Sequence, residues 1–243
     1  MPYTPFEEVR DFFYKRHNHI AELDDAAEAM AAQMELPIGR MAPGLMAYLE
    51  SRCGVNVVVD TSGELGAGMQ RLFDARARTL RLSASLDAGQ QAFQLATQIA
   101  ILELEELIGA IVSQASLSSD EARGLARIGL ANYFAGALIL PYTAFLTEAE
   151  QSRYDIERLG HRFGVGFETI CHRLSTLQRH NARGVPFFFI RVDRAGNISK
   201  RQSATDFHFS RVGGTCPLWS VYEAFASPGR ILTQLARMPD DRT

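Results

Sequence analysis

The sequence predicts an α+β fold, in which a mostly helical part with a small sheet is followed by a small antiparallel β-rich part. Stretches of helical periodicity, separated by proline and glycine, make up most of residues 6–178. Short strand-like runs interrupt them between residues 55 and 83. After Arg183 the runs PFFFIRVD and GNISKRQS predict a hairpin. We therefore expect two domains, residues 1–182 and 183–243.

The first elements are two helices and a small sheet. Apolar residues recur at helical spacing through residues 6–36, and Pro37 and Gly39 end that run. Residues 43–53 form a second amphipathic segment, with Gly54 as a C-cap. VNVVVD at 55–60 has the β-branched content of a strand, and MQRLFDARARTLRLS predicts two more strands around a turn.

Long helices are expected to follow this sheet. Asp87 can cap a helix that runs to about Val112, and Ser118 or Ser119 one that stops at Pro141. A short helix reaches Ser152. Residues 155–163 and 167–178 predict a helix pair around the break 164–166. The pair has the outline of a helix–turn–helix, but we expect it to belong to the core rather than to read DNA.

The tail has a character of its own. A loop-rich run follows the predicted hairpin and leads into a short helix, SVYEAFA, and ILTQLARM predicts a last strand. A hairpin partner for that strand would lie beyond Thr243, so we expect the second domain to be truncated at its C-terminus.

The bulk composition is that of a globular chain. Its 243 residues are 47% hydrophobic and carry a net charge of −3, which argues against a general nucleic-acid binder. No apolar run reaches the roughly 18 residues of a membrane span, and the N-terminus has no signal-peptide pattern. The three cysteines are widely spaced and predict no disulfide framework. The expected location is the cytoplasm, with no membrane partner.

Two motifs resemble the zinc-peptidase scaffold of the ImmA/IrrE family. They are FQLATQIAILEL at 93–104 and ANYFAGALILPYTAF at 131–145. The resemblance implies HExxH on the first helix, where two histidines at i and i+4 would bind zinc. Here Thr97, Gln98 and Ile101 occupy those positions. We therefore expect a degenerate scaffold without zinc and without catalytic residues.

Four blocks of the tail carry a second resemblance: CHRLSTLQR, GVPFFFIRVDRAGNISKRQSA, FHFSRVGGTCPLW and FASPGRILTQLARMP. They look like the C-terminal region of the short-chain fatty acyl transcriptional regulators. That family implies an effector domain that binds acyl-CoA, with propionyl-CoA or acetyl-CoA as ligand. It also implies a DNA-binding helix–turn–helix domain, which nothing before Pro5 could form, and a cysteine-rich stretch with an iron–sulfur cluster in the full-length protein.

A cluster of basic residues is compatible with such a ligand. Residues 171–211 hold eight Lys or Arg and two acidic residues. Arginine binds phosphate in a bidentate manner, and an adenine or a short acyl group needs aromatic or apolar walls. The predicted ligand-binding residues are Tyr133, Tyr142, Arg173, Arg191, Lys200, Arg201 and Arg211.

Cys216, in GGTCPLW, is the candidate cluster ligand, because a Cys-Pro pair beside glycines is a common setting for a cluster thiolate. Alone it cannot hold a cluster. Two alternatives stay open for the chain as a whole: a zinc-dependent peptidase or hydrolase of the ImmA/IrrE type, and a purely structural oligomerisation module. Regulators that read palindromic DNA are usually dimers, so we expect a homo-oligomer.

Overall fold

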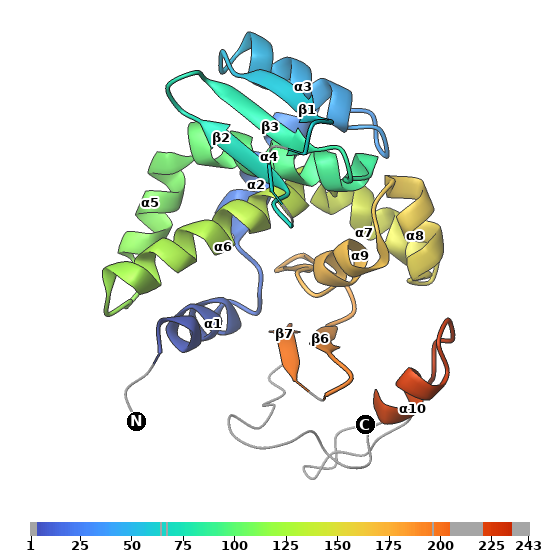
Figure 1. Cartoon of the computed structure of the whole chain (residues 1–243). Helices are drawn as coiled ribbons and strands as arrows, with labels where there is room; N and C mark the ends of the chain where they lie inside the picture. Colours follow the sequence, from blue (N-terminus) through green and yellow to red (C-terminus); the bar gives the residue numbers. More distant parts are fainter. Residues whose placement is uncertain (1–3, 64, 67, 196, 205–220, 235–243) are drawn as a thin grey trace.

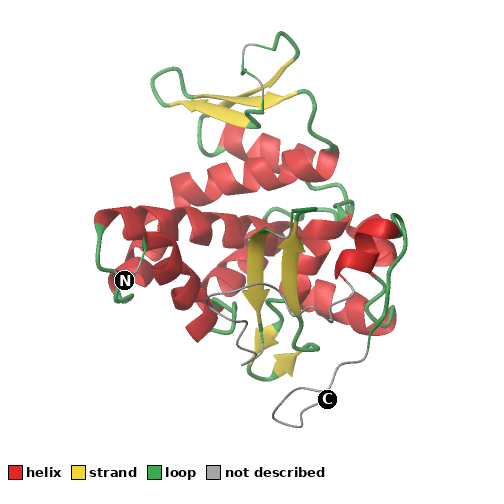
Figure 2. Cartoon of the chain, turned by 60° about the horizontal axis from the view of Figure 1, so that its bottom comes forward, coloured by secondary structure: helices red, strands yellow, loops and turns green. Residues whose placement is uncertain are grey.

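A computed structural model describes residues 4–63, 65, 66, 68–195, 197–204 and 221–234, and only the backbone of 198–203, 221 and 222. A three-stranded sheet lies on one side of a layered set of helices, and a two-stranded hairpin lies on the opposite side (Figures 1 and 2). The architecture is α+β, as predicted.

The chain begins with two helices rather than one. They are α1 (Pro5–Lys15), with a capping box at Thr4, and α2 (Ala21–Gln33). The prediction of a single helix over residues 6–36 was wrong. His17 and Asn18 have φ of 49° and 53°, a left-handed conformation that no α-helix continues through. The break turns α2 into the core, where Leu23, Asp24 and Ala27 are fully buried.

The small sheet follows α3 (Ala42–Ser51). Its strands are β1 (Asn56–Asp60), β2 (Arg71–Asp74) and β3 (Thr79–Ser83), in the order β1-β3-β2. β1 runs parallel to β3, and β2 runs antiparallel to it. Leu80 and Leu82 are fully buried against the helices, whereas Arg81 between them is exposed. Figure 2 shows the helices on one face of the sheet and open space over the other.

The central helices carry most of the core. α4 (Ala88–Glu103) starts with a capping box at Asp87, as predicted. It ends at Leu104, where α5 (Glu105–Ser113) begins in a new direction, so the prediction of one helix to Val112 was wrong. α6 (Asp120–Ile139), capped by Ser119, packs along α4, and α7 (Tyr142–Gln151) follows Pro141.

The predicted helix pair is α8 (Ile156–Phe163) and α9 (Phe167–Leu174). The second helix ends before the predicted limit at residue 178, where a short strand begins. Both helices turn apolar residues inward, as expected for core helices; these are Leu159, Phe163, Ile170 and Leu174. Gly164 ends α8 with φ of 66°, and the carbonyl oxygen of Gly39 would lie 2.5 Å from a Cβ there. The turn between the two helices therefore packs directly against the loop between α2 and α3.

The last elements are two small hairpins and a helix. They are β4 (Gln178–Arg179) with β5 (Ala182–Arg183), β6 (Phe188–Val192) with β7 (Ile198–Ser203), and α10 (Val221–Ala226). The β6–β7 hairpin and the short helix agree with the prediction. Residues 231–234, the described part of the predicted last strand, form no strand.

Among the described residues, no single helix is long and apolar enough to cross a membrane. By length and composition only, the bent pair α6 and α7 passes that test together, with a bend of 61° at the break.

Candidate functional site

The face of α4 that would carry a metal motif has other chemistry. The Thr97 hydroxyl donates to the Phe93 carbonyl oxygen at 2.8 Å, and the Gln98 Oε1 accepts from Arg71 Nη1 at 2.8 Å. The Ile101 side chain is 45% exposed. Nowhere in the described part of the chain do three or more His, Cys, Asp or Glu side chains gather in a way that could hold a metal ion. The described residues therefore offer no ligand set for a hydrolytic zinc.

A buried polar cluster joins three distant helices. Asp24 on α2 lies 2.6 Å from Arg173 Nη2 on α9 and accepts from the Tyr133 hydroxyl of α6 at 2.6 Å. Arg173 also donates to the Leu140 carbonyl at 2.9 Å and to the Thr176 hydroxyl at 3.1 Å. Asp24 and Arg173 are 0% and 3% exposed. The cluster is a buried ion pair, to which the Tyr133 hydroxyl adds a hydrogen bond and His19 Nε2 a contact of 3.3 Å with Asp24 Oδ2.

Burial and the neighbouring charges shift the pKa values of Asp24 and Tyr133. Burial raises the pKa of Asp24, but the Arg173 charge and the hydrogen bonds from His19, Arg173 and Tyr133 outweigh it and lower the pKa from 3.8 to about 2. Burial and the neighbouring Asp24 charge raise the pKa of Tyr133 well above its usual value. Asp24 is therefore ionised and Tyr133 neutral at every physiological pH.

Tyr142 links this cluster to the segment after α9. Its hydroxyl donates to the Ala182 carbonyl at 2.8 Å and accepts from the Arg179 backbone N–H at 2.8 Å. The guanidinium of Arg179 lies 4.1 Å from the Tyr142 ring centre and forms ion pairs with Glu28 at 2.6 Å and Asp25 at 3.3 Å. The β4–β5 hairpin is thereby fixed to α2 and α7.

The structure thus brings together three of the predicted ligand residues, Tyr133, Tyr142 and Arg173. All three are engaged in internal hydrogen bonds, so their contact with a ligand stays a prediction. Their partners Asp24 and Arg179 were not predicted. Asp24 lies 109 and 149 positions from Tyr133 and Arg173, whereas Arg179 lies 37 positions from Tyr142. The acidic residues of the alanine-rich α2 were the available signal.

The predicted residues of the tail lie apart from this cluster. Arg191 is half-exposed, and its Nη1 lies 3.0 Å from Glu168 Oε1 on α9. In the β6–β7 register, Lys200 stands directly opposite Arg191, and Arg201 opposite Ile190. The hairpin therefore places two cationic residues at adjacent backbone positions. Arg211 and Cys216 lie outside the described residues.

The two described cysteines have raised pKa values. Burial and the nearby Glu103 raise the pKa of the Cys53 thiol to about 12, and the thiol lies 3.3 Å from Glu103 Oε1. Burial and Glu168 raise the pKa of Cys171 to about 11. Both thiols are therefore neutral at physiological pH.

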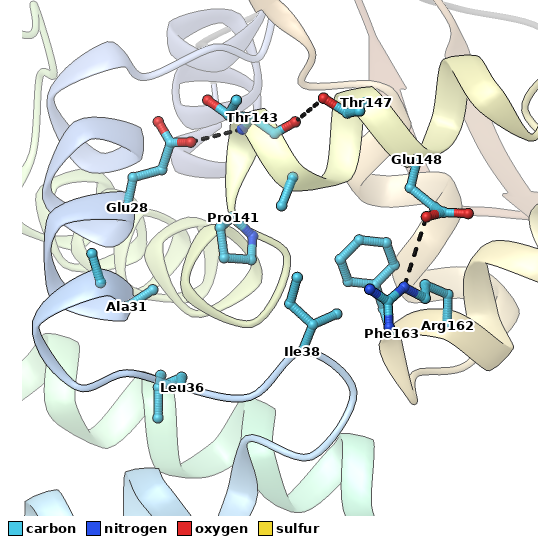
Figure 3. A pocket seen from close by; sticks show the side chains of 12 residues that line it. Glu28, Ala31, Leu36, Ile38, Pro141, Thr143, Thr147, Glu148, Arg162 and Phe163 are labelled. Carbon is cyan, nitrogen blue, oxygen red and sulfur yellow. Dashed lines mark hydrogen bonds and ion pairs between the residues drawn. The ribbon is translucent and has the colours of Figure 1, made fainter.

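An open groove lies between α2, α7 and α8 (Figure 3), with a volume of about 550 Å³. Its walls are mainly apolar and are formed by Ala31, Ala32, Leu36, Ile38, Pro141, Ala144 and Phe163. At one end Glu28 accepts from the Thr143 backbone N–H at 2.7 Å, and at the other Arg162 lies 3.7 Å from Glu148. The groove was not predicted from the sequence, because its walls come from three separate segments.

Two protein-family models match this chain. Residues 52–175 match the model described as "IrrE N-terminal-like domain", and residues 176–243 match "Short-chain fatty acyl coenzyme A regulator, C-terminal". The fold and the altered α4 face thus define a protein built on an IrrE-like scaffold. The chain belongs to the family of short-chain fatty acyl coenzyme A regulators.

Its relatives agree along nearly the whole chain. The HTH-type transcriptional regulators PrpR and RamB of Mycobacterium tuberculosis are 56% and 53% identical over 98% of this chain. The propionyl-CoA carboxylase regulator of Cereibacter sphaeroides is 47% identical over the same share. A solved Mycobacterium tuberculosis transcriptional regulator superposes with a TM-score of 0.94 at 56% identity, and the match covers 98% of this chain and 72% of that one. The chain spans about half the length of the curated relatives it matches.

Proposed function

We propose that this chain is the acyl-CoA-sensing effector region of a transcriptional regulator of short-chain fatty acid metabolism, without catalytic activity. The names of its relatives, which include regulators of transcription and of propionyl-CoA carboxylase, support this assignment. The α4 face, with Thr97, Gln98 and Ile101, offers neither a zinc ligand set nor a general base. Binding is therefore a better account of the described residues than hydrolysis.

The observation that carries the proposal is the pairing of Arg191 with Lys200 in the β6–β7 register, inside the segment that matches the acyl coenzyme A regulator model. Coenzyme A carries several phosphate oxygens, and adjacent cations on a hairpin are suited to bind them. Glu168 competes for the Arg191 guanidinium, so ligand binding exchanges one anionic partner for another. Arg201 and Arg211 are proposed as further contacts from the same segment.

The response would pass from the tail to the helical body. Arg179 and Tyr142 fix the β4–β5 hairpin to α2 and α7, only a few residues before β6. A ligand that binds one arrangement of the tail better than another shifts the population of that arrangement. The DNA-binding domain of such a regulator would lie in the half of the relatives that this chain does not span. A coupling of about 1–3 kcal/mol is enough for a regulatory effect.

Calorimetric titration with CoA, acetyl-CoA and propionyl-CoA tests the proposal. We expect binding of the acyl-CoAs that weakens as salt is raised, because ion pairs with phosphate are screened. Charge reversal by Arg191→Glu or Lys200→Glu should reduce the affinity at least tenfold, or about 1.4 kcal/mol. Arg127→Glu, an exposed position on α6, makes the same charge change as a control.

The proposal would be contradicted if millimolar ligand gave no heat of binding and no change in the Tm. Equal losses in the hairpin variants and in Arg127→Glu would show that net charge, rather than the hairpin, determines binding.

A further inference from the structure

The guanidinium of Arg71 lies under the sheet, next to α4. Arg71 opens β2 and pairs with Leu82, which is fully buried, so both side chains face the helices. Its Nη1 donates to Gln98 Oε1 at 2.8 Å. Desolvation alone lowers the pKa of Arg71, and in the described part of the chain no carboxylate lies within ion-pair distance of it. A partly buried cation without a counter-ion is unusual in a folded protein.

Gln98 adds a second donor without an acceptor. The side chain is 1% exposed, and its Nε2 has no hydrogen-bond partner. The contact with Arg71 fixes the orientation of the amide, because a guanidinium has no acceptor and only Oε1 can face it. This corner of the molecule therefore has an excess of donors, and each buried group left unpaired costs about 1–3 kcal/mol. An acceptor from outside the chain would satisfy both groups.

The surroundings indicate the size and polarity of that acceptor. One turn before Gln98, the Gln94 Nε2 donates to Gln70 Oε1 at 2.7 Å, so that side of the corner is closed by a satisfied amide pair. Three residues after Gln98, and hence on the same helix face, Ile101 is 45% exposed. An accessible apolar surface, that of Ile101, thus lies next to the hydrogen-bond donors of Arg71 and Gln98.

We propose that Arg71 and Gln98 form a binding site for a small monocarboxylate with a short hydrocarbon tail. The carboxylate oxygens accept from the Arg71 guanidinium and the Gln98 Nε2, and the tail lies on Ile101. The carboxylate contacts the half-buried guanidinium first and then the neighbouring Gln98 Nε2, while Gln98 Oε1 keeps its hydrogen bond from Arg71. A guanidinium binds a planar carboxylate through two parallel hydrogen bonds. The site is separate from the hairpin proposed for acyl-CoA, and a free acid rather than its thioester is the ligand.

Thermal unfolding of the full chain in sodium propionate, acetate, phosphate or chloride at equal ionic strength tests the proposal. At about ten times Kd, propionate should raise the Tm of the wild-type protein by roughly 3–6 °C relative to chloride. Gln98→Glu supplies the carboxylate from within the chain. This variant should have a higher Tm without ligand and no response to propionate beyond that to chloride. Gln94→Glu makes the same change one turn away and should respond as the wild type does.

An equal response of the wild-type protein to propionate and chloride, or an equal propionate response in Gln98→Glu, overturns the proposal. A response to phosphate alone overturns the carboxylate assignment. The side-chain ¹⁵N signals of Arg71 and Gln98 in the wild-type protein give a readout that needs no variant. If these signals do not shift when propionate is added, the proposal is overturned. Lys200→Glu should keep the propionate response, and Gln98→Glu should keep acyl-CoA binding. The proposal for this site and the proposal for the hairpin can therefore be contradicted independently.

Discussion

The carboxylate of Asp24 holds together parts of the chain that are far apart in sequence. It pairs with Arg173, 149 positions away, and with Tyr133, 109 positions away, in surroundings that exclude water. Removing one partner of such a pair leaves the other charge buried and uncompensated, which costs far more than the pair contributes when it is intact. The cluster therefore acts mainly as a constraint on how α2, α6 and α9 pack.

Asp24→Asn should destabilise the protein by about 3–5 kcal/mol, because it leaves the Arg173 guanidinium buried without a counter-charge. Urea unfolding of the full chain measures the loss. Asp25→Asn is the matched control: the neighbouring side chain is 73% exposed and pairs with Arg179 at the surface, so its loss should cost less than about 1 kcal/mol. Similar losses in the two variants would contradict a special role for the buried pair.

The lowered pKa of Asp24 also predicts an acid transition. The pKa falls from 3.8 to about 2 on folding, so the folded state favours the ionised carboxyl. That contribution is fully present above the unfolded pKa and is lost as the pH falls through the folded pKa. We expect the unfolding free energy of the wild-type protein to drop by about 2 kcal/mol between about pH 4.5 and pH 2 through this group. Urea titrations across that range should show a smaller drop in Asp24→Asn, and parallel curves would contradict the assignment.

At the scale of elements, three glycines allow close contact between backbone segments. A Cβ on Gly89, in the first turn of α4, would lie 2.4 Å from the Gly164 carbonyl oxygen, and one on Gly39 would lie 2.7 Å from the Arg162 carbonyl oxygen. The start of α4, the turn between α8 and α9 and the loop after α2 thus meet backbone to backbone. This contact sets one wall of the groove in Figure 3, since Ile38 and Phe163 lie beside it.

Gly89→Ala should destabilise the protein by about 1–3 kcal/mol, because the new methyl group must push a backbone carbonyl aside. Gly124→Ala is the control within a helix: apart from its chain neighbours and the backbone of its own helix, no atom lies within 4 Å of its Cβ position, and alanine should stabilise α6 by about 0.5–1 kcal/mol. Thermal or urea unfolding separates the two signs. A stabilising Gly89→Ala would show that the α8–α9 turn is free to move.

The sequence predicted where helices and strands lie better than it predicted where helices are interrupted. Periodicity and caps located the sheet, α6 and the hairpin after Arg183, because those signals are local. The breaks at His17 and Leu104 were missed, because neither glycine nor proline marks them. The Asp24–Arg173 pair and the Arg71–Gln98 contact could not be predicted, since no local pattern reports a contact between distant segments.

At the scale of the whole molecule, the hydrophobic core extends from Phe12 to Leu177 as one connected cluster. Ala182 and Phe187 pack against it from outside, and the Gly184 backbone N–H donates to the Leu177 carbonyl at 2.9 Å. The expected domain boundary between residues 182 and 183 thus falls inside a segment that is still bound to the helical body. It stays a prediction, and the contacts of this segment make it testable.

A fragment of residues 1–187 should fold by itself and unfold in one cooperative transition, with a Tm close to that of the full chain. It retains Leu177, the Arg179 ion pairs and the Phe187 ring, which lies 5.4 Å from the Tyr154 ring. A fragment of residues 1–176 has nearly the same length but loses fully buried Leu177 and leaves the Tyr142 hydroxyl without its two backbone partners. The loss of Leu177 costs about 2–5 kcal/mol and an unpaired hydroxyl about 1–3 kcal/mol. Differential scanning calorimetry should therefore find the shorter fragment strongly destabilised.

Broad, non-cooperative unfolding of the 1–187 fragment would contradict this prediction, because it would mean that the tail belongs to the same folding unit as the helices. A ligand bound on the β6–β7 hairpin would then change the stability of the whole chain. It would not act on the packing of one domain against another.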